Sequence, residues 1–178
     1  MRGICLLHHR PHSYEPLKSI MRLPRDEAFA LASKLYEDKT CMANSRFSPD
    51  EFANYYDTRL KAEKRLYDKF ITLGGKPKEK HPLYFYVHGW DLSKKFWANS
   101  VTEKLELDDI NASDISFTFG DSHVENDTPE RNRLFMKDEL LELIPKHGGI
   151  EGLLAYVQSQ LGYAMIEAHL WNDEYVSR

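Results

Sequence analysis

Apolar and polar positions along the chain follow two periods, and together they predict about five strands and several helices. Alternation with a period of two is typical of strands, whereas apolar residues that recur every three or four positions indicate helices. The predicted strands cover residues 4–9, 83–88, 101–107, 115–119 and 164–171. The predicted helices cover residues 24–38, 48–73, 93–98, 128–144 and 150–161. Residues 101–107 are also compatible with a helix, so both assignments remain open there.

The helix expected at about residues 48–73 carries the clearest local signals. Ser48-Pro49-Asp50-Glu51 offers an N-cap hydroxyl, a proline at the first helical position and a glutamate three residues after the cap. An apolar stripe follows, and Gly74-Gly75 supplies the C-terminal stop. A helix of about 25 residues spans roughly 37 Å, so we expect it to lie across a whole sheet.

The order of these elements predicts the fold class. Helices and strands do not alternate regularly, which favours an α+β arrangement over a doubly wound α/β sheet. No linker-like segment divides the chain. We therefore predict that residues 1–178 form a single α+β domain with a mixed or antiparallel sheet of about five strands. Helices, including the long one, are expected to cover this sheet.

Composition narrows the class of protein. A net charge of -4 argues against a dedicated nucleic-acid-binding protein, which usually has a basic excess. No apolar stretch approaches the length of a transmembrane helix, and Ile4–Leu7 is too short for the core of a signal peptide. Cys5 and Cys41 form neither a disulfide framework nor a Cys-x-x-Cys motif. We expect a cytoplasmic protein that binds neither membranes nor nucleic acid.

Two strands end in similar histidine-containing sequences. Alternation places Tyr84, Tyr86 and His88 on one side of the first strand, and it places Glu167, His169 and Trp171 on one side of the second. If the two sides face the same way, imidazoles and a carboxylate share one surface. Histidine titrates near neutrality and ligates metals, so His88, His169 and Glu167 are candidate catalytic residues. The alternative is a packed face of hydrogen-bonded side chains.

A polar segment after the fourth strand is a candidate metal site. Asp121 and His123 alternate with Glu125 and Asp127, so in an extended chain the four side chains project the same way. Oxygen and nitrogen ligands suit a divalent metal, which is the cofactor we consider. The alternative is a polar loop that leads into the next helix and needs no ligand.

Aromatic side chains near the strand ends form a third candidate site. Tyr84, Tyr86, Trp90 and Trp171 offer large contact areas for a planar ligand or a peptide. Because the chain has ten tyrosines, several of them are also expected at the edge of the core.

No phosphate-binding glycine loop or nucleophile elbow is present in the sequence. We therefore predict a domain that binds an unidentified small molecule or protein. One alternative is an enzyme with a His/Glu acid–base or metal-assisted site, either a hydrolase or a nucleotide-processing transferase. A second is a homodimeric structural subunit, because residues 57–80 hold eight Lys/Arg against four Asp/Glu and residues 103–151 hold thirteen acids against five bases.

Overall fold

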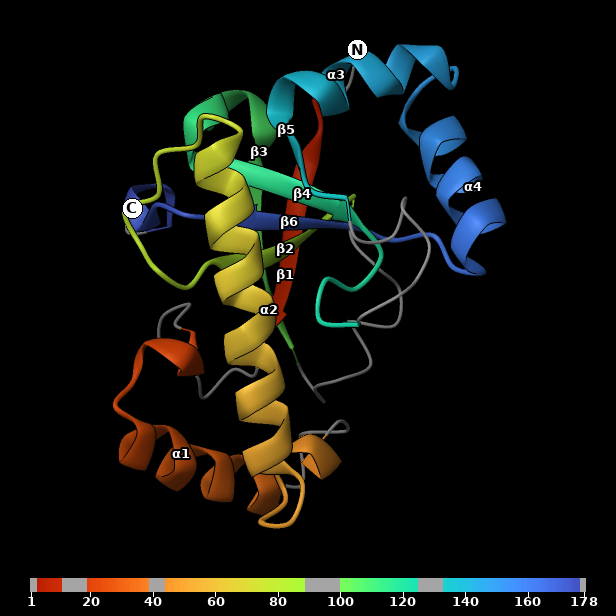
Figure 1. Cartoon of the computed structure of the whole chain (residues 1–178). Helices are drawn as coiled ribbons and strands as arrows, with labels where there is room; N and C mark the ends of the chain where they lie inside the picture. The colour runs from red at the N-terminus through yellow and green to blue at the C-terminus, as the bar shows by residue number, and fades with distance from the viewer. Residues whose placement is uncertain (1–2, 11–18, 39–43, 89–99, 125–132, 177–178) are drawn as a thin grey trace.

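The computed structural model describes residues 3–10, 19–38, 44–88, 100–124 and 133–176. Its centre is an antiparallel sheet in the order β3-β1-β2-β6-β4-β5 (Figure 1). The strands are β1 (Cys5–Arg10), β2 (Leu83–Val87), β3 (Val101–Glu106), β4 (Ile115–Phe119), β5 (Phe135–Met136) and β6 (Ile166–Leu170). The α+β class is confirmed, and residues 101–106 form a strand rather than a helix. The sheet has one strand more than the sequence predicted.

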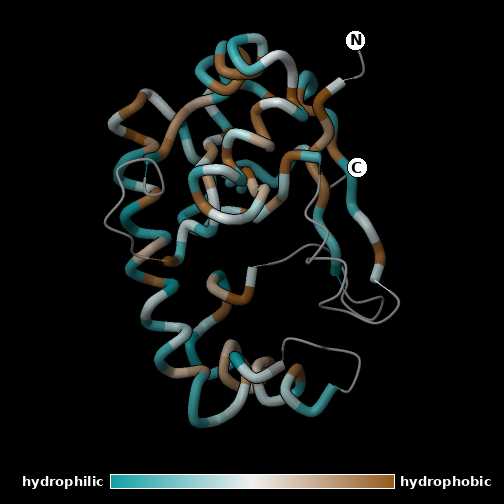
Figure 2. Tube along the Cα trace, turned by 90° about the vertical axis from the view of Figure 1, so that its right-hand side faces the viewer, coloured by the Kyte–Doolittle hydropathy of each residue, from teal (hydrophilic) through white to brown (hydrophobic). Residues whose placement is uncertain are grey.

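Helices pack on both sides of this sheet. Helix α2 (Phe52–Thr72) lies on one side, and α3 (Lys137–Lys146) and α4 (Ile150–Leu161) lie on the other. Helix α1 (Arg25–Glu37) lies away from the sheet and packs against α2. The predicted long helix is α2, and Ser48 accepts a hydrogen bond from the backbone N–H of Glu51 just before it. Hydrophilic and hydrophobic segments alternate along α2 in Figure 2, as expected of a helix with one buried face. The helix expected at residues 93–98 lies outside the described residues.

The extra strand corrects the helix predicted at residues 128–144. Within the described part of that stretch, residues 135–136 pair with β4, and α3 begins only at Lys137. The ring of Phe135 packs against Phe117 and Phe119, and this burial outweighs the local helical spacing. Helix α3 also continues through Pro145 to Lys146, although the proline removes one N–H from the helical hydrogen bonds.

One face of the sheet is apolar. Phe85 of β2, Ala168 of β6 and Phe117 of β4 lie opposite one another in register, so their side chains form a row on this face. Helices α3 and α4 cover the row and contribute Leu140 and Leu153 to the same fully buried core. This core anchors the strands and leaves the opposite face free to carry polar groups.

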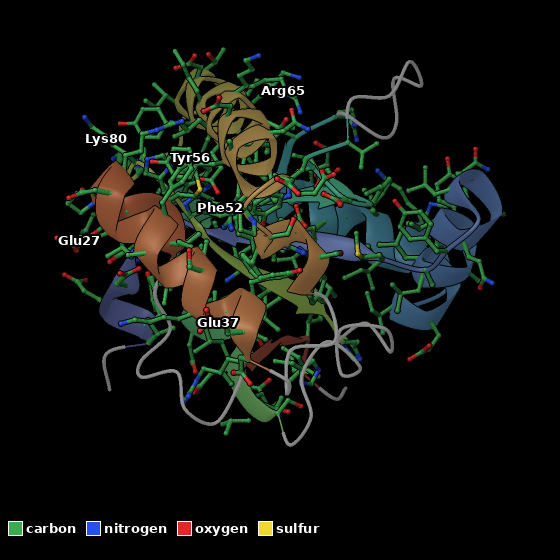
Figure 3. All side chains as sticks on the ribbon, turned by 90° about the horizontal axis from the view of Figure 1, so that it is seen from below. Glu27, Glu37, Phe52, Tyr56, Arg65 and Lys80 are labelled. Carbon is green, nitrogen blue, oxygen red and sulfur yellow. The ribbon has the colours of Figure 1, made fainter. Side chains whose placement is uncertain are left out.

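The opposite face is polar and lies beneath α2. Tyr84, His169 and Ser116 form one row across β2, β6 and β4, and the next row follows in the same register with Tyr86, Glu167 and Thr118. Figure 1 shows α2 running across this side of the sheet and continuing beyond it to α1. There a second small core forms, to which Phe52 and Tyr56 of α2 belong (Figure 3). Helix α2 therefore joins this second core to the polar face of the sheet.

Candidate functional site

A buried carboxylate on α2 organises the polar face. The Glu63 side chain is fully buried and accepts hydrogen bonds from Arg59 Nε at 2.7 Å, His81 Nδ1 at 2.5 Å and the Tyr84 hydroxyl at 3.2 Å. Burial alone would raise the pKa of Glu63. The charge of Arg59 and the hydrogen bonds from His81 and Arg59 outweigh burial and hold that pKa below its usual value. Glu63 is therefore an anion inside the protein.

Arg59 neutralises Glu63 from the preceding helical turn. The two residues are four positions apart on α2, which places their side chains on the same face. The Arg59 guanidinium also lies over the Tyr84 ring, 5.1 Å from its centroid, and donates a hydrogen bond to the Tyr55 hydroxyl at 3.2 Å. A buried charge pair persists only when its remaining hydrogen-bonding groups are satisfied in this way.

Tyr84 of β2 lies at the centre of the group. Burial and the neighbouring Glu63 carboxylate raise the pKa of Tyr84 well above its usual value, so the phenol keeps its proton. Its oxygen lies 3.2 Å from Glu63 Oε1 and 3.1 Å from His123 Nε2. The Tyr84 ring also contacts the His123 and His169 rings, with centroids 5.1 and 5.5 Å apart.

His123 forms the solvent-facing end of this group. Its Nδ1 lies 3.2 Å from Asp121 Oδ1, and its backbone N–H donates to the same oxygen at 2.8 Å. Burial would raise the pKa of Asp121, but the hydrogen bonds and charge of His123 outweigh burial and lower it. The side chains of His123 and Asp121 are 21% and 43% exposed. We call Arg59, Glu63, His81, Tyr84, Asp121 and His123 the Tyr84 cluster.

The loop that carries His123 is held at Ser122. Its N–H and hydroxyl both donate to Glu167 Oε1, and its carbonyl accepts a hydrogen bond from Arg65 Nη2 at 2.9 Å. Figure 3 labels Arg65 on α2. The preceding Gly120 has a φ of +75°, and a Cβ there would lie 2.8 Å from the Tyr163 hydroxyl oxygen, so glycine suits the position. These contacts place His123 against Tyr84.

A second chain of hydrogen bonds crosses the sheet beside the cluster. Trp171 Nε1 donates to Ser116 Oγ at 2.9 Å, Ser116 Oγ lies 3.2 Å from His169 Nδ1, and His169 Nε2 lies 3.0 Å from Glu167 Oε1. The serine, histidine and carboxylate are in the order of a nucleophilic triad. All of them are buried, however, and the serine oxygen is bound by Trp171. We assign this chain to the support of the Ser122 loop.

The structure brings together several residues that the sequence singled out. Tyr84 and Tyr86 lie directly opposite His169 and Glu167 on the polar face. Trp171 is fully buried and stacks on Phe70 of α2 at 5.2 Å, so its ring belongs to the core. Trp90 lies outside the described residues.

His88 is separate from the other candidates. It follows β2 in a left-handed conformation with a φ of 55°, and its N–H donates to the Cys5 carbonyl. His169 pairs with Tyr84, and His88 lies four residues beyond Tyr84. Four residues span about 13 Å along a strand. Its Nε2 is buried, and no hydrogen-bond partner for it occurs among the described residues. His88 therefore takes no part in the Tyr84 cluster.

Asp121 and His123 bind each other rather than project together as separate ligands. Within the ranges that the structure describes, no group of three or more His, Cys, Asp or Glu residues is arranged to hold a metal ion. Glu125 and Asp127, the other members of the predicted segment, lie outside those ranges. Metal binding by Asp121 and His123 therefore stays a prediction.

Three residues of the cluster were not among the site residues predicted from the sequence, namely Arg59, Glu63 and His81. One signal was available, because Glu63 lies seven residues after Tyr56 and seven before Phe70, on the buried stripe of α2. A charged residue on such a stripe needs a partner, and Arg59 four positions earlier is the nearest candidate.

Comparison of the chain with known protein families, curated proteins and solved structures finds no match. Across the described segments, none of the helices combines the length and apolar character needed to cross a membrane. The function is therefore inferred from the chemistry of the site itself.

Proposed function

We propose that the protein is an enzyme that performs general acid–base chemistry on a small polar substrate, with His123 as the proton-exchanging group. The observation that supports this proposal is the position of His123 between Asp121 and Tyr84. A partly exposed imidazole with a carboxylate beside one nitrogen and a phenolic hydroxyl beside the other is the arrangement of a general base or acid.

Each residue of the site has a distinct role in this proposal. Asp121 accepts a hydrogen bond from the Nδ1–H of His123. This fixes the tautomer in which Nε2 is free to exchange a proton. A water molecule or substrate hydroxyl that approaches Nε2 replaces the Tyr84 hydroxyl as its partner. Tyr84, which stays protonated, then donates a hydrogen bond to an oxygen of the substrate. Activation of water in this way is the chemistry of a hydrolase, and activation of a substrate hydroxyl is that of a transferase.

A second candidate function is binding without catalysis. It is favoured by the rings of Tyr55, Tyr84 and Tyr86 together with two arginines on the same side of the sheet. Arg59 lies over the Tyr84 ring, and Arg46 lies 5.7 Å from the centroid of the Tyr55 ring. Stacked rings and guanidinium groups bind planar or anionic ligands and need no proton transfer.

Turnover distinguishes the two candidates. The protein is assayed against panels of model esters, phosphoesters and amides, and the same panels are run with His123→Gln and with His147→Gln as a control outside the cluster. For a substrate that wild type turns over, we expect His123→Gln to lower kcat by about 10²–10⁴-fold and His147→Gln to leave it unchanged. Ligand-dependent stabilisation without any turnover that depends on His123 would favour the binding function.

Three further expectations from the sequence remain proposals. The lack of a disulfide framework supports a cytosolic location. The opposed charges of residues 57–80 and 103–151 support the homodimeric alternative. A divalent metal remains a proposed cofactor, with Asp121 and His123 as the candidate ligands, because their carboxylate and imidazole groups lie together.

A further inference from the structure

The Tyr84 hydroxyl connects two histidines from different parts of the chain. His81 Nδ1 lies 2.5 Å from Glu63 Oε2, Glu63 Oε1 lies 3.2 Å from the Tyr84 oxygen, and that oxygen lies 3.1 Å from His123 Nε2. His81 and His123 are 22% and 21% exposed, whereas Glu63 is fully buried. Two imidazoles that solvent can reach therefore stand at the ends of a buried hydrogen-bonded chain.

The number of protons on this chain limits its hydrogen bonds. The Tyr84 hydroxyl has one proton, and the Glu63 carboxylate can only accept. When His123 is an imidazolium, both of its ring N–H groups donate, one to Asp121 and one to the Tyr84 oxygen. The Tyr84 hydroxyl then donates its hydrogen bond to Glu63. All contacts of the chain are satisfied together only in this state.

Deprotonation of His123 reverses one of these bonds. Neutral His123 keeps the proton on Nδ1, which faces Asp121, so Nε2 becomes an acceptor. The Tyr84 hydroxyl then donates to His123 Nε2, and Glu63 loses a donor. A carboxylate with fewer donors attracts the remaining proton more strongly. Loss of a proton at His123 therefore strengthens the hold of Glu63 on the proton of His81.

We propose that the Tyr84 hydroxyl couples the protonation of His123 to that of His81 through Glu63. A proton or ligand that binds His123 changes the protonation of His81 at the other end of the cluster, and the reverse effect has the same size. This coupling concerns the site of the proposed function, but it depends on hydrogen bonds and not on turnover. It therefore holds even if His123 is not catalytic.

The other charged groups at each end are held by partners of their own. On the His81 side, Arg59 is paired with Glu63, and Arg22 donates to the His81 carbonyl while it pairs with Asp173. These pairs surround His81 with opposite charges that bind each other.

The charged groups at the His123 end are also held by partners. Arg65 and Glu167 both bind Ser122, and the charge of Arg46 acts on the Asp121 carboxylate. The His169 ring lies beside the Tyr84 ring and is held by Glu167. Among the described contacts, Tyr84 is the residue that hydrogen-bonds to both His123 and Glu63.

The coupling is tested by nuclear magnetic resonance of the histidine rings as pH is varied. The titration midpoint of His123 is compared in wild type, His81→Gln, Tyr84→Phe and the double variant. In the presence of Tyr84 we expect His81→Gln to change the proton-binding constant of His123 by roughly threefold or more, or about half a pH unit. In the Tyr84→Phe background the change should fall to about a third of that or less, because only direct repulsion between charges remains.

Two results would overturn the coupling. One is an equal effect of His81→Gln on the His123 midpoint in both backgrounds. It would mean that the two rings interact directly by charge and that Tyr84 does not transmit the coupling. The other is no effect in either background. If Tyr84→Phe does not fold, the wild-type and His81→Gln titrations are repeated at high salt, because salt screens direct repulsion between the two rings and leaves a coupling through hydrogen bonds largely intact. Turnover is not measured here, so failure of the catalytic proposal and failure of the coupling are distinguishable.

Discussion

Glu167 binds Ser122 twice, through the backbone N–H and the hydroxyl of the serine. Ser122 stands between Asp121 and His123, so a carboxylate buried in β6 fixes both members of the solvent-facing pair. The described hydrogen bonds of the Glu167 carboxylate go to Ser122 and His169 and not to the side chains of that pair, so we regard Glu167 as a positioning residue. This relationship explains how a loop places an imidazole against Tyr84 with a hydrogen-bonding distance of 3.1 Å.

Replacement of Ser122 by alanine tests this anchoring. The variant removes the hydroxyl bond and leaves Glu167 with one donor fewer in a buried position, so we expect a loss of about 1–3 kcal/mol in the free energy of unfolding. Urea denaturation measures this loss. Ser159→Ala is the control, because that hydroxyl binds a carbonyl at an exposed position, and its effect should stay within about 0.5 kcal/mol. Equal losses in the two variants would contradict the anchoring role.

Glu63→Gln tests the buried charge pair. Removal of the carboxylate leaves the Arg59 guanidinium without its counter-charge, so we expect a loss of about 3 kcal/mol at neutral pH. The control is Asp68→Asn, which breaks an exposed pair with Lys64 and should cost less than about 1 kcal/mol.

The ionised state of Glu63 also predicts how the free energy of unfolding depends on pH. The folded-state pKa of Glu63 is lowered from 4.5, so its contribution to stability is present above 4.5 and is lost as pH falls through the folded value. Wild type should therefore lose stability more steeply than Glu63→Gln in this acidic range. Parallel slopes of Tm against pH for the two proteins would contradict the ionised state of Glu63.

The burial of His8 predicts a separate loss of stability as pH falls from 6.5 to about 4. Burial lowers the pKa of His8 from 6.5 to about 4, although the hydrogen bond to the Tyr84 carbonyl acts in the opposite direction. The unfolded chain therefore binds a proton at pH values where the folded protein does not, and the stability present above 6.5 is lost as pH falls toward 4. Denaturation of wild type and His8→Gln across this range should show a shallower decline in the variant, and His147→Gln should decline like wild type.

Two glycines with similar backbone conformations distinguish the cost of a positive φ from the cost of a steric contact. Gly120 and Gly162 have φ values of +75° and +82°, but a Cβ on Gly162 meets nothing within 4 Å, whereas one on Gly120 meets the Tyr163 hydroxyl. We expect Gly162→Ala to cost about 1 kcal/mol from strain alone and Gly120→Ala to cost clearly more. Chemical denaturation compares them, and an equal cost would show that the contact with Tyr163 does not constrain the Ser122 loop.

Much of the fold was predictable because its signals are local. The alternation of residues 83–88 and 115–119 marks strands with one apolar face, and the cap at Ser48 with the stop at Gly74 marks α2. The two residues of β5 are too few to show a period. Their strand conformation depends on contacts of Phe135 with a distant part of the chain.

The candidate site was predictable only in part. Alternation placed Tyr84 with Tyr86 and Glu167 with His169, and the register of β2 against β6 then brought these pairs to one face. The contact of Tyr84 with His123 joins positions 39 residues apart, and no spacing in the sequence indicates it. His88 adopts a left-handed conformation that alternation along the strand does not predict.

The ring nitrogens of His123 provide the most direct test of the account. Nitrogen-15 chemical shifts of this ring, followed from acidic to basic pH, report which nitrogen holds the proton in the neutral form. We predict that Nδ1 keeps its proton, because it faces Asp121, and that Nε2 gains and loses one next to Tyr84. A neutral ring that carries its proton on Nε2 instead would contradict the role of His123 as the proton-exchanging group.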